Sequence, residues 1–195
     1  KILKSQLMNK KASWGIVGLG VMGTNISRNF VKNDISLALY NRHIENKEEK
    51  VAYKRTQEFI ELSSSLAFES LDSFIKALKR PRKVLLMLPS GEPIDKLIKD
   101  ILPLLSEGDI ILDGGNSHFE NTEKRLSMLA KNKIRFLGVG ISGGDQGALK
   151  GPSLMVGGDK SAYKTVSKDL ESIAAKNSYG GSCCEFLGSG GAGHY

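Results

Sequence analysis

The sequence is poor in cysteine and has no long apolar run. Its 195 residues include two cysteines, which are adjacent at Cys183 and Cys184. Adjacent cysteines rarely bridge each other, and they lack the spacing of metal ligands, so we expect packed thiols, a reducing cytoplasmic compartment and no bound metal. The longest apolar run, VLLML, is far too short to span a bilayer. The first residues, KILKSQLMNKK, lack an apolar segment, so we expect neither a signal peptide nor a membrane partner.

The chain also lacks a dense arginine run, although basic residues are in excess. The 28 Lys and Arg residues against 21 Asp and Glu give a formal net charge of +7. Such a balance is typical of a lysine-rich solvated surface and favours anionic ligands. Because the basic residues are spread along the chain without interleaved aromatics, we expect no nucleic-acid partner. A phosphorylated small molecule fits the charge equally well.

Apolar, β-rich segments alternate with helical patterns along the chain. Strands are expected at SWGIVGLG, SLALYNR, KVLLML, DIILD, IRFLGVG and LMVGG. Apolar residues at helical spacing predict helices that include residues 26–30, 71–78, 94–101, 126–129 and 163–173. The charged segment NKEEKVAYKRTQE is expected to be solvated helix or loop. Strands that alternate with crossover helices predict an α/β fold with a doubly wound, mostly parallel sheet.

The segment GLGVMG places Gly18, Gly20 and Gly23 in the spacing G-x-G-x-x-G, after a predicted strand and before a predicted helix. This context is typical of a Rossmann-like dinucleotide-binding turn. Gly18 permits the tight turn, Gly20 lets the backbone approach a pyrophosphate, and Gly23 lets the helix pack close to the strand. We therefore expect the cofactor to contact Gly18, Leu19, Gly20, Val21, Met22 and Gly23.

The end of the second predicted strand, YNRH, has no carboxylate. NAD-binding folds usually place Asp or Glu there to bind the ribose 2′-hydroxyl, whereas this chain has Asn41, Arg42 and His43. A guanidinium can pair with a 2′-phosphate, which a carboxylate would repel. The sequence therefore predicts a preference for NADP, bound through Asn41, Arg42 and His43. The alternative is that Arg42 is an ordinary surface residue.

Three glycine-rich segments, MLPSG, DGGNS and GISGGDQGALKGPS, each follow a predicted strand. Ligands of such folds bind outside the carboxyl ends of the strands, so we expect these three loops to line one crevice beside the cofactor. The alternative is that the strands simply end in glycine turns. Within the first loop, Leu88 and Pro89 are expected to contact the cofactor.

The motifs GLGVMGTN, YNR, DGGNS, SGGDQGALKGPSLMVGG and GAGH, in this order and spacing, resemble 6-phosphogluconate dehydrogenase from about Trp14 to the last residue. The resemblance implies NADP-dependent oxidative decarboxylation of 6-phosphogluconate to ribulose 5-phosphate, in the pentose phosphate pathway, by a full-length homodimer. It implies that Asn116 lies between substrate and nicotinamide, and that Ser142, Gly143 and Gly144 bind substrate. An amide and a hydroxyl suit sugar hydroxyls, and bare glycines let backbone N–H groups reach a carboxylate.

The resemblance also implies that the catalytic base and acid, a lysine and a glutamate, lie beyond Tyr195 on a helix that begins at GAGH. We accordingly expect an N-terminal extension at 1–12, an NADP-binding domain at 13–190, and the start of an inter-domain helix at 191–195. The family's all-helical C-terminal domain is expected to be absent, no catalytic residue is expected within the chain, and the isolated chain should bind NADP without reducing it. His118, His194 and Lys150 offer no substitute pair.

Two positions depart from the family pattern. His43 stands where Thr or Ser is usual, and Gln146 stands where a second Glu is usual, so the resemblance implies no carboxylate role for residue 146. Three alternatives remain: a related 3-hydroxyacid dehydrogenase, which would usually carry D-x-S-T in place of DGGN, a stand-alone dinucleotide-binding module without turnover, and a binder of anionic polymers.

Overall fold

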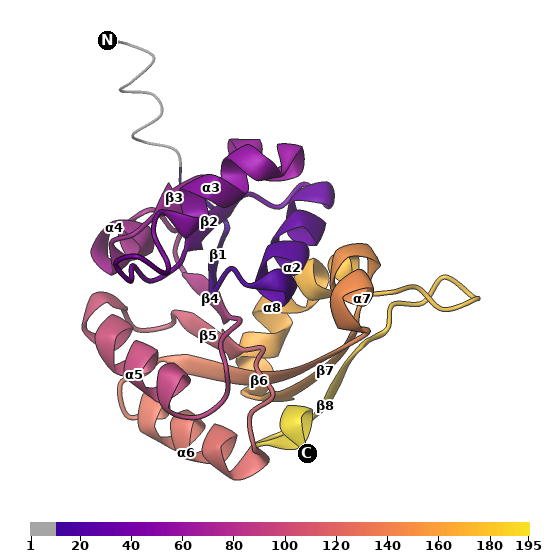
Figure 1. Ribbon diagram of the computed structural model, residues 1–195. Helices are drawn as coiled ribbons and strands as arrows, with labels where there is room; N and C mark the ends of the chain where they lie inside the picture. Colours follow the sequence, from indigo (N-terminus) through magenta and orange to yellow (C-terminus); the bar gives the residue numbers. More distant parts are fainter. Residues whose placement is uncertain (1–10) are drawn as a thin grey trace.

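The computed structural model describes residues 11–195, which form one eight-stranded sheet with helices on both faces (Figure 1). Residues 1–10 of the predicted extension, and with them the expected lack of a signal peptide, fall outside the described residues. Ala12 is buried, and its N–H donates to the carbonyl of Ala77 at 2.8 Å. Within the described part of the chain, no helix combines the length and the apolar character needed to cross a membrane.

The sheet has the order β3-β2-β1-β4-β5-β6-β7-β8. Neighbouring strands from β3 to β6 are parallel, β7 is antiparallel to β6, and β8 is parallel to β7. The predicted doubly wound, mostly parallel sheet is therefore confirmed. The strands are β1 (Trp14–Val17), β2 (Leu37–Tyr40), β3 (Leu66–Phe68), β4 (Lys83–Leu86), β5 (Ile110–Asp113), β6 (Arg135–Ser142), β7 (Ser153–Gly158) and β8 (Cys184–Gly188).

The helices lie between the strands, and all five helical patterns of the sequence are confirmed. The α-helices are α2 (Val21–Lys32), α3 (Val51–Glu58), α4 (Leu71–Lys76), α5 (Glu92–Ile101), α6 (Phe119–Ala130), α7 (Gly144–Lys150) and α8 (Lys160–Ile173). Short 3₁₀ helices are η1 (Ile60–Ser64), η2 (Leu102–Leu104) and η3 (Ala192–His194). The charged segment read as solvated helix or loop contains α3, of which only Ala52 is buried.

One expectation about the loops was wrong. The segment after β6 was read as a loop, but residues 144–150 form α7. Asn29, which is buried on α2, donates its amide N–H to the carbonyls of Ala148 at 3.1 Å and Ile173 at 2.8 Å. These contacts hold the segment against α2, where it can turn helically despite its glycines.

The strands are buried on both faces, which separates the apolar residues into two cores. Successive side chains of a strand point to opposite faces. Ile16 and Leu85 therefore join the core under α2 and α8, whereas Val17 and Leu86 join the core under α4, α5 and α6. Figure 1 shows α5 and α6 on one side of the sheet and α2, α7 and α8 on the other. Burial on both faces explains why the strands read as continuous apolar runs.

Candidate functional site

The GLGVMG turn connects the carboxyl end of β1 to the N-terminus of α2. Gly18 has φ +91, and a Cβ on it would lie 2.3 Å from the carbonyl oxygen of Met87. A Cβ on Gly23 would lie 1.9 Å from the carbonyl oxygen of Gly18. The fold itself therefore requires glycine at both positions, in agreement with the roles predicted from the motif.

Gly20 is different, because the fold leaves space around it. Its φ is −66, a conformation open to any residue, and no described atom lies within 4 Å of where its Cβ would be. It precedes the first residue of α2, and no described side chain caps that helix or places an acidic group in its first turn. The positive end of the helix dipole is thus open to an anion beside the bare backbone of Gly20.

The remaining residues of the turn differ in exposure. Leu19 is buried, whereas Val21 is 62% exposed at the start of α2 and Met22 is half-buried. The N–H of Leu19 donates to Oδ1 of Asn41 at 3.0 Å, and its carbonyl accepts a long hydrogen bond from Nε of Arg55 on α3 at 3.4 Å. Asn41 therefore ties the end of β2 to the glycine turn, and Arg55 is a nearby cation that the sequence patterns did not single out.

The YNRH segment extends from the end of β2 as predicted, but a carboxylate lies beside it. Nδ2 of Asn41 donates to Glu48 at 2.9 Å, and Nη2 of Arg42 donates to Glu48 at 2.9 Å. His43 contacts Glu69 through Nδ1 at 3.1 Å. The hydrogen bond from Arg42 holds the pKa of Glu48 below its usual value. The YNRH segment itself contains no carboxylate, but the fold places the carboxylates of Glu48 and Glu69 beside it.

The loops after β4 and β5 meet the GLGVMG turn. A Cβ on Gly18 would lie 2.8 Å from Cδ2 of Leu88, and a Cβ on Gly115 would lie 2.7 Å from the carbonyl oxygen of Leu88. Pro89 follows in the same segment, and Asn116 is exposed just beyond Gly115. The structure thus brings the predicted cofactor contacts Leu88 and Pro89 together with the glycine turn and the DGGNS loop at one edge of the sheet.

A buried ion pair fixes the DGGNS loop. Asp113 is fully buried, and its carboxylate accepts hydrogen bonds from the N–H of Gly115 at 3.0 Å, Oγ of Ser117 at 2.7 Å and Nη1 of Arg125 at 3.0 Å. Nη1 of Arg125 also donates to Oγ of Ser117 at 2.9 Å. The exposed Asn116 therefore lies on a loop whose two ends are held by one arginine of α6.

The predicted substrate residues of the third segment lie at the end of β6. Ser142, Gly143 and Gly144 are exposed, and the two glycines have φ +134 and +60, which only glycine adopts readily. Asn25 on α2 donates to the carbonyl of Asp145 at 3.0 Å. This turn therefore lies beside α2, the helix that follows the GLGVMG turn. Gln146, one of the two departures from the family pattern, is exposed on α7.

The GAGH segment packs onto a surface of glycines in β6 and β7. A Cβ on Gly157 would lie 2.3 Å from the N of Gly193, and one on Gly138 would lie 2.9 Å from Nδ1 of His194. His194 contacts Oγ1 of Thr122 through Nδ1 at 2.7 Å, and its Nε2 is buried without a partner among the described residues. The predicted inter-domain helix start is here the 3₁₀ turn η3.

Burial of the His194 imidazole makes the stability of the fold depend on pH. Burial lowers the pKa of His194 below its usual 6.5, so the unfolded chain binds the proton more readily. The stability that comes from burying the neutral His194 imidazole is fully present above about pH 6.5, and it is lost as the pH falls through the folded-state pKa. We expect His194→Gln to flatten this loss in urea unfolding measured between pH 7.5 and 5. The exposed His118→Gln should keep the wild-type pH dependence, and an unchanged slope in His194→Gln would contradict the assignment.

The other titratable candidates have structural surroundings. His118 is exposed and accepts a long hydrogen bond from the N–H of Glu120 at 3.4 Å, so it caps α6. Cys184 is buried, and burial raises the pKa of its thiol to about 11. Lys150 is exposed at the end of α7. That the chain lacks a pair suited to general acid–base work stays a prediction from the sequence.

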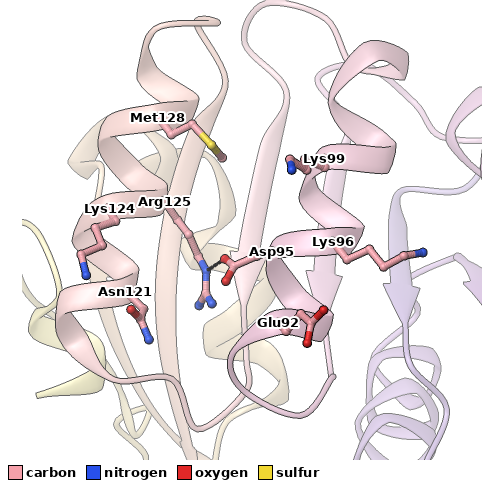
Figure 2. Close-up of a pocket in the computed structure, with 8 residues that line it drawn as sticks. All are labelled: Glu92, Asp95, Lys96, Lys99, Asn121, Lys124, Arg125 and Met128. Atoms are coloured by element: carbon pink, nitrogen blue, oxygen red, sulfur yellow. Dashed lines mark hydrogen bonds and ion pairs between the residues drawn. The ribbon is translucent and has the colours of Figure 1, made fainter.

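A cavity of about 510 Å³ lies between α5 and α6. Figure 2 shows Arg125 reaching from α6 toward Asp95 on α5, and Nε donates to Oδ1 of Asp95 at 2.7 Å. Lys96 points away from this pair. Arg125 therefore connects this ion pair to the DGGNS loop, because it also donates to Asp113 and Ser117.

Comparison with known proteins gives consistent matches. A family model described as the NAD binding domain of 6-phosphogluconate dehydrogenase matches residues 13–188. The chain is 44% identical over 181 residues to the decarboxylating 6-phosphogluconate dehydrogenase of Chlamydia pneumoniae, covering 93% of this chain and 36% of that protein. It is 42% identical over 181 residues to that of Bacillus licheniformis, covering 93% and 37%.

Solved structures agree with these matches. The 6-phosphogluconate dehydrogenase of Plasmodium falciparum, whose structures include complexes with its cofactor NADP+ and its substrate 6-phosphogluconate, aligns with a TM-score of 0.83 and 34% identity, over 94% of this chain and 38% of that one. A 3-hydroxyisobutyrate dehydrogenase of Mycobacterium tuberculosis shares the fold, with a TM-score of 0.73 and 22% identity over 94% of this chain and 57% of that one. The chain thus spans well under half the length of the 6-phosphogluconate dehydrogenases it matches.

Proposed function

The chain belongs to the 6-phosphogluconate dehydrogenase family, and on this premise we propose that it is the NADP-binding part of an enzyme that oxidatively decarboxylates 6-phosphogluconate. The observation that carries the proposal is the open space over Gly20 at the uncapped N-terminus of α2. A pyrophosphate fits this place because backbone N–H groups and the helix dipole face it.

The adenosine end of the cofactor is proposed to lie over the end of β2. Arg42 is exposed there, with a side chain 64% accessible, and Asn41 is fixed to the glycine turn by its hydrogen bond from Leu19. A guanidinium suits a 2′-phosphate because it offers several N–H donors and a permanent charge. His43 could add a donor to the same phosphate, in place of the family's usual hydroxyl.

The substrate is proposed to bind between the DGGNS loop and the end of β6. The amide of Asn116 and the hydroxyl of Ser142 suit sugar hydroxyls, and the N–H groups of Gly143 and Gly144 suit a carboxylate. Bound NADP would accept the hydride that leaves C3 of the substrate. From the family resemblance we propose that a lysine and a glutamate outside the described residues act as base and acid. The whole enzyme is proposed to be a cytoplasmic homodimer.

Arg42→Ala tests the cofactor assignment. A charge-assisted hydrogen bond contributes about 1.5–3 kcal/mol, so loss of Arg42 should weaken NADP binding about tenfold or more. NAD has no 2′-phosphate, and its affinity should change little. The measurement is isothermal titration of the chain with each cofactor.

Lys54→Ala is the matched control, because Lys54 is an exposed cation on the neighbouring helix α3. It should bind NADP as the wild-type chain does, which separates the local contact from the loss of one positive charge. Equal affinities of the wild-type chain for NADP and NAD, or an unchanged NADP affinity in Arg42→Ala, would contradict the proposal.

A further inference from the structure

We infer that Glu48 is a specificity-determining residue of the cofactor site: its carboxylate holds Arg42 in the free chain, so a 2′-phosphate must displace it, which weakens the preference for NADP over NAD. The inference rests on the proposed function, because it concerns the same arginine. It adds a residue that lies outside the glycine motif and outside the YNRH segment.

The carboxylate of Glu48 accepts hydrogen bonds from the guanidinium of Arg42. Oε1 accepts hydrogen bonds from Nη2 of Arg42 at 2.9 Å and from Nε at 3.3 Å. Oε2 accepts from Nδ2 of Asn41 at 2.9 Å. A carboxylate that faces two nitrogens of a guanidinium takes the position in which a phosphate would bind, because both anions use the same planar set of donors.

The backbone keeps Glu48 in this position. The N–H of Ile44 donates to the carbonyl of Glu48 at 2.9 Å, and the N–H of Glu48 donates back to Ile44 at 2.7 Å. Between them Asn46 adopts φ +59, which closes the turn. This turn brings the chain back beside the end of β2. The backbone hydrogen bonds of the turn hold Glu48 where its carboxylate faces Arg42.

The two cofactors make different demands on this pair. The 2′-hydroxyl of NAD is neutral, so the contact between Arg42 and Glu48 can persist beside it. The 2′-phosphate of NADP carries negative charge and competes with the carboxylate for the guanidinium. Only NADP binding has to break or share the pair, and Glu48 thereby narrows the difference between the two affinities.

Glu48→Gln tests this competition. The glutamine oxygen can still accept from Asn41, but the negative charge of residue 48 that faces Arg42 is removed. Isothermal titration should give NADP binding roughly two- to fivefold tighter than in the wild-type chain, as expected for a partly exposed ion pair, with NAD affinity changed by less than twofold. Glu45→Gln, which removes an exposed charge from the same turn, should leave both affinities unchanged. In an Arg42→Ala background the gain from Glu48→Gln should shrink, because the shared partner is gone.

The outcomes separate the inference from the proposed function. If the wild-type chain does not bind NADP, the proposed function fails. If it binds NADP but Glu48→Gln binds it no more tightly, or if Glu45→Gln gives the same gain, the inference alone is overturned. A gain that persists undiminished in the Arg42→Ala background would also overturn it, because the effect would then not act through Arg42.

Discussion

Arg125→Met should lower the free energy of unfolding by about 3–5 kcal/mol, the usual cost of removing one partner of a buried ion pair. The Arg125 side chain is 3% exposed and the Asp113 side chain is fully buried, with Nη1 and Oδ2 3.0 Å apart. Methionine fills much of the same volume but leaves the carboxylate in the interior without a cation. The two hydrogen bonds that Asp113 accepts from its own loop cannot compensate for a buried charge.

Urea unfolding followed by circular dichroism would measure this change. Lys133→Met is a suitable control, because Lys133 pairs with Glu107 at 3.0 Å while both side chains are about 70% exposed. Such a surface pair contributes at most about 1 kcal/mol. In the double variant Arg125→Met/Asp113→Asn part of the stability should return, because no buried charge is left unpaired and the Asp95 side chain is 58% exposed. A cost for Arg125→Met no larger than that for Lys133→Met would refute this account.

Arg125 contributes to the stability of the fold and also holds two of the loops at the carboxyl ends of the strands. Besides holding Asp113 and Ser117, Arg125 donates to the carbonyl of Gly91 at 3.3 Å, and Gly91 is the last residue of the MLPSG segment, directly before α5. Two of the three glycine-rich segments therefore share one buried cation. Their relative position depends on a residue that contacts neither proposed ligand, so Arg125 is a positioning residue rather than a binding one.

Regular elements with a strong periodic pattern could be predicted from the sequence. The apolar residues Ile94, Leu97, Ile98 and Ile101 form one buried stripe of α5, because the same face that gives the pattern also meets the sheet. The short strand β3 was not predicted, since its three residues are only half-buried. Strand β8 was also missed, because it lies at the edge of the sheet and buries only Cys184 fully.

The parts of the site that depend on a few residues close together in the sequence could also be predicted. The glycine turn depends on three residues within six positions, and the chain folds it between β1 and α2. Glu48 was not predicted, because it lies in a charged run that is typical of a solvated face. Arg125 was not predicted either, since its partner Asp95 is 30 residues away and only the packing of α6 against α5 brings the two together. Contacts made by long polar side chains across distant segments leave no periodic pattern.

Gly20→Ala should abolish or severely weaken NADP binding without lowering the stability of the chain. The new methyl group would meet no described atom, and the φ of −66 suits alanine. Alanine also restricts the unfolded chain, so stability should stay equal or rise by up to about 1 kcal/mol. In the proposed complex, however, the methyl group stands where the pyrophosphate approaches the backbone, so the dissociation constant should rise at least about tenfold, equivalent to about 1.4 kcal/mol.

Gly23→Ala provides the contrast, because its Cβ would lie 1.9 Å from the carbonyl oxygen of Gly18 in the fold itself. It should lower the free energy of unfolding by about 1–3 kcal/mol, as overpacking usually does. Titration with NADP and urea unfolding on both variants would therefore place one glycine with the ligand and the other with the fold. NADP binding by Gly20→Ala at wild-type affinity would mean that the open space over Gly20 is not the pyrophosphate site, and the observation that carries the proposed function would be lost.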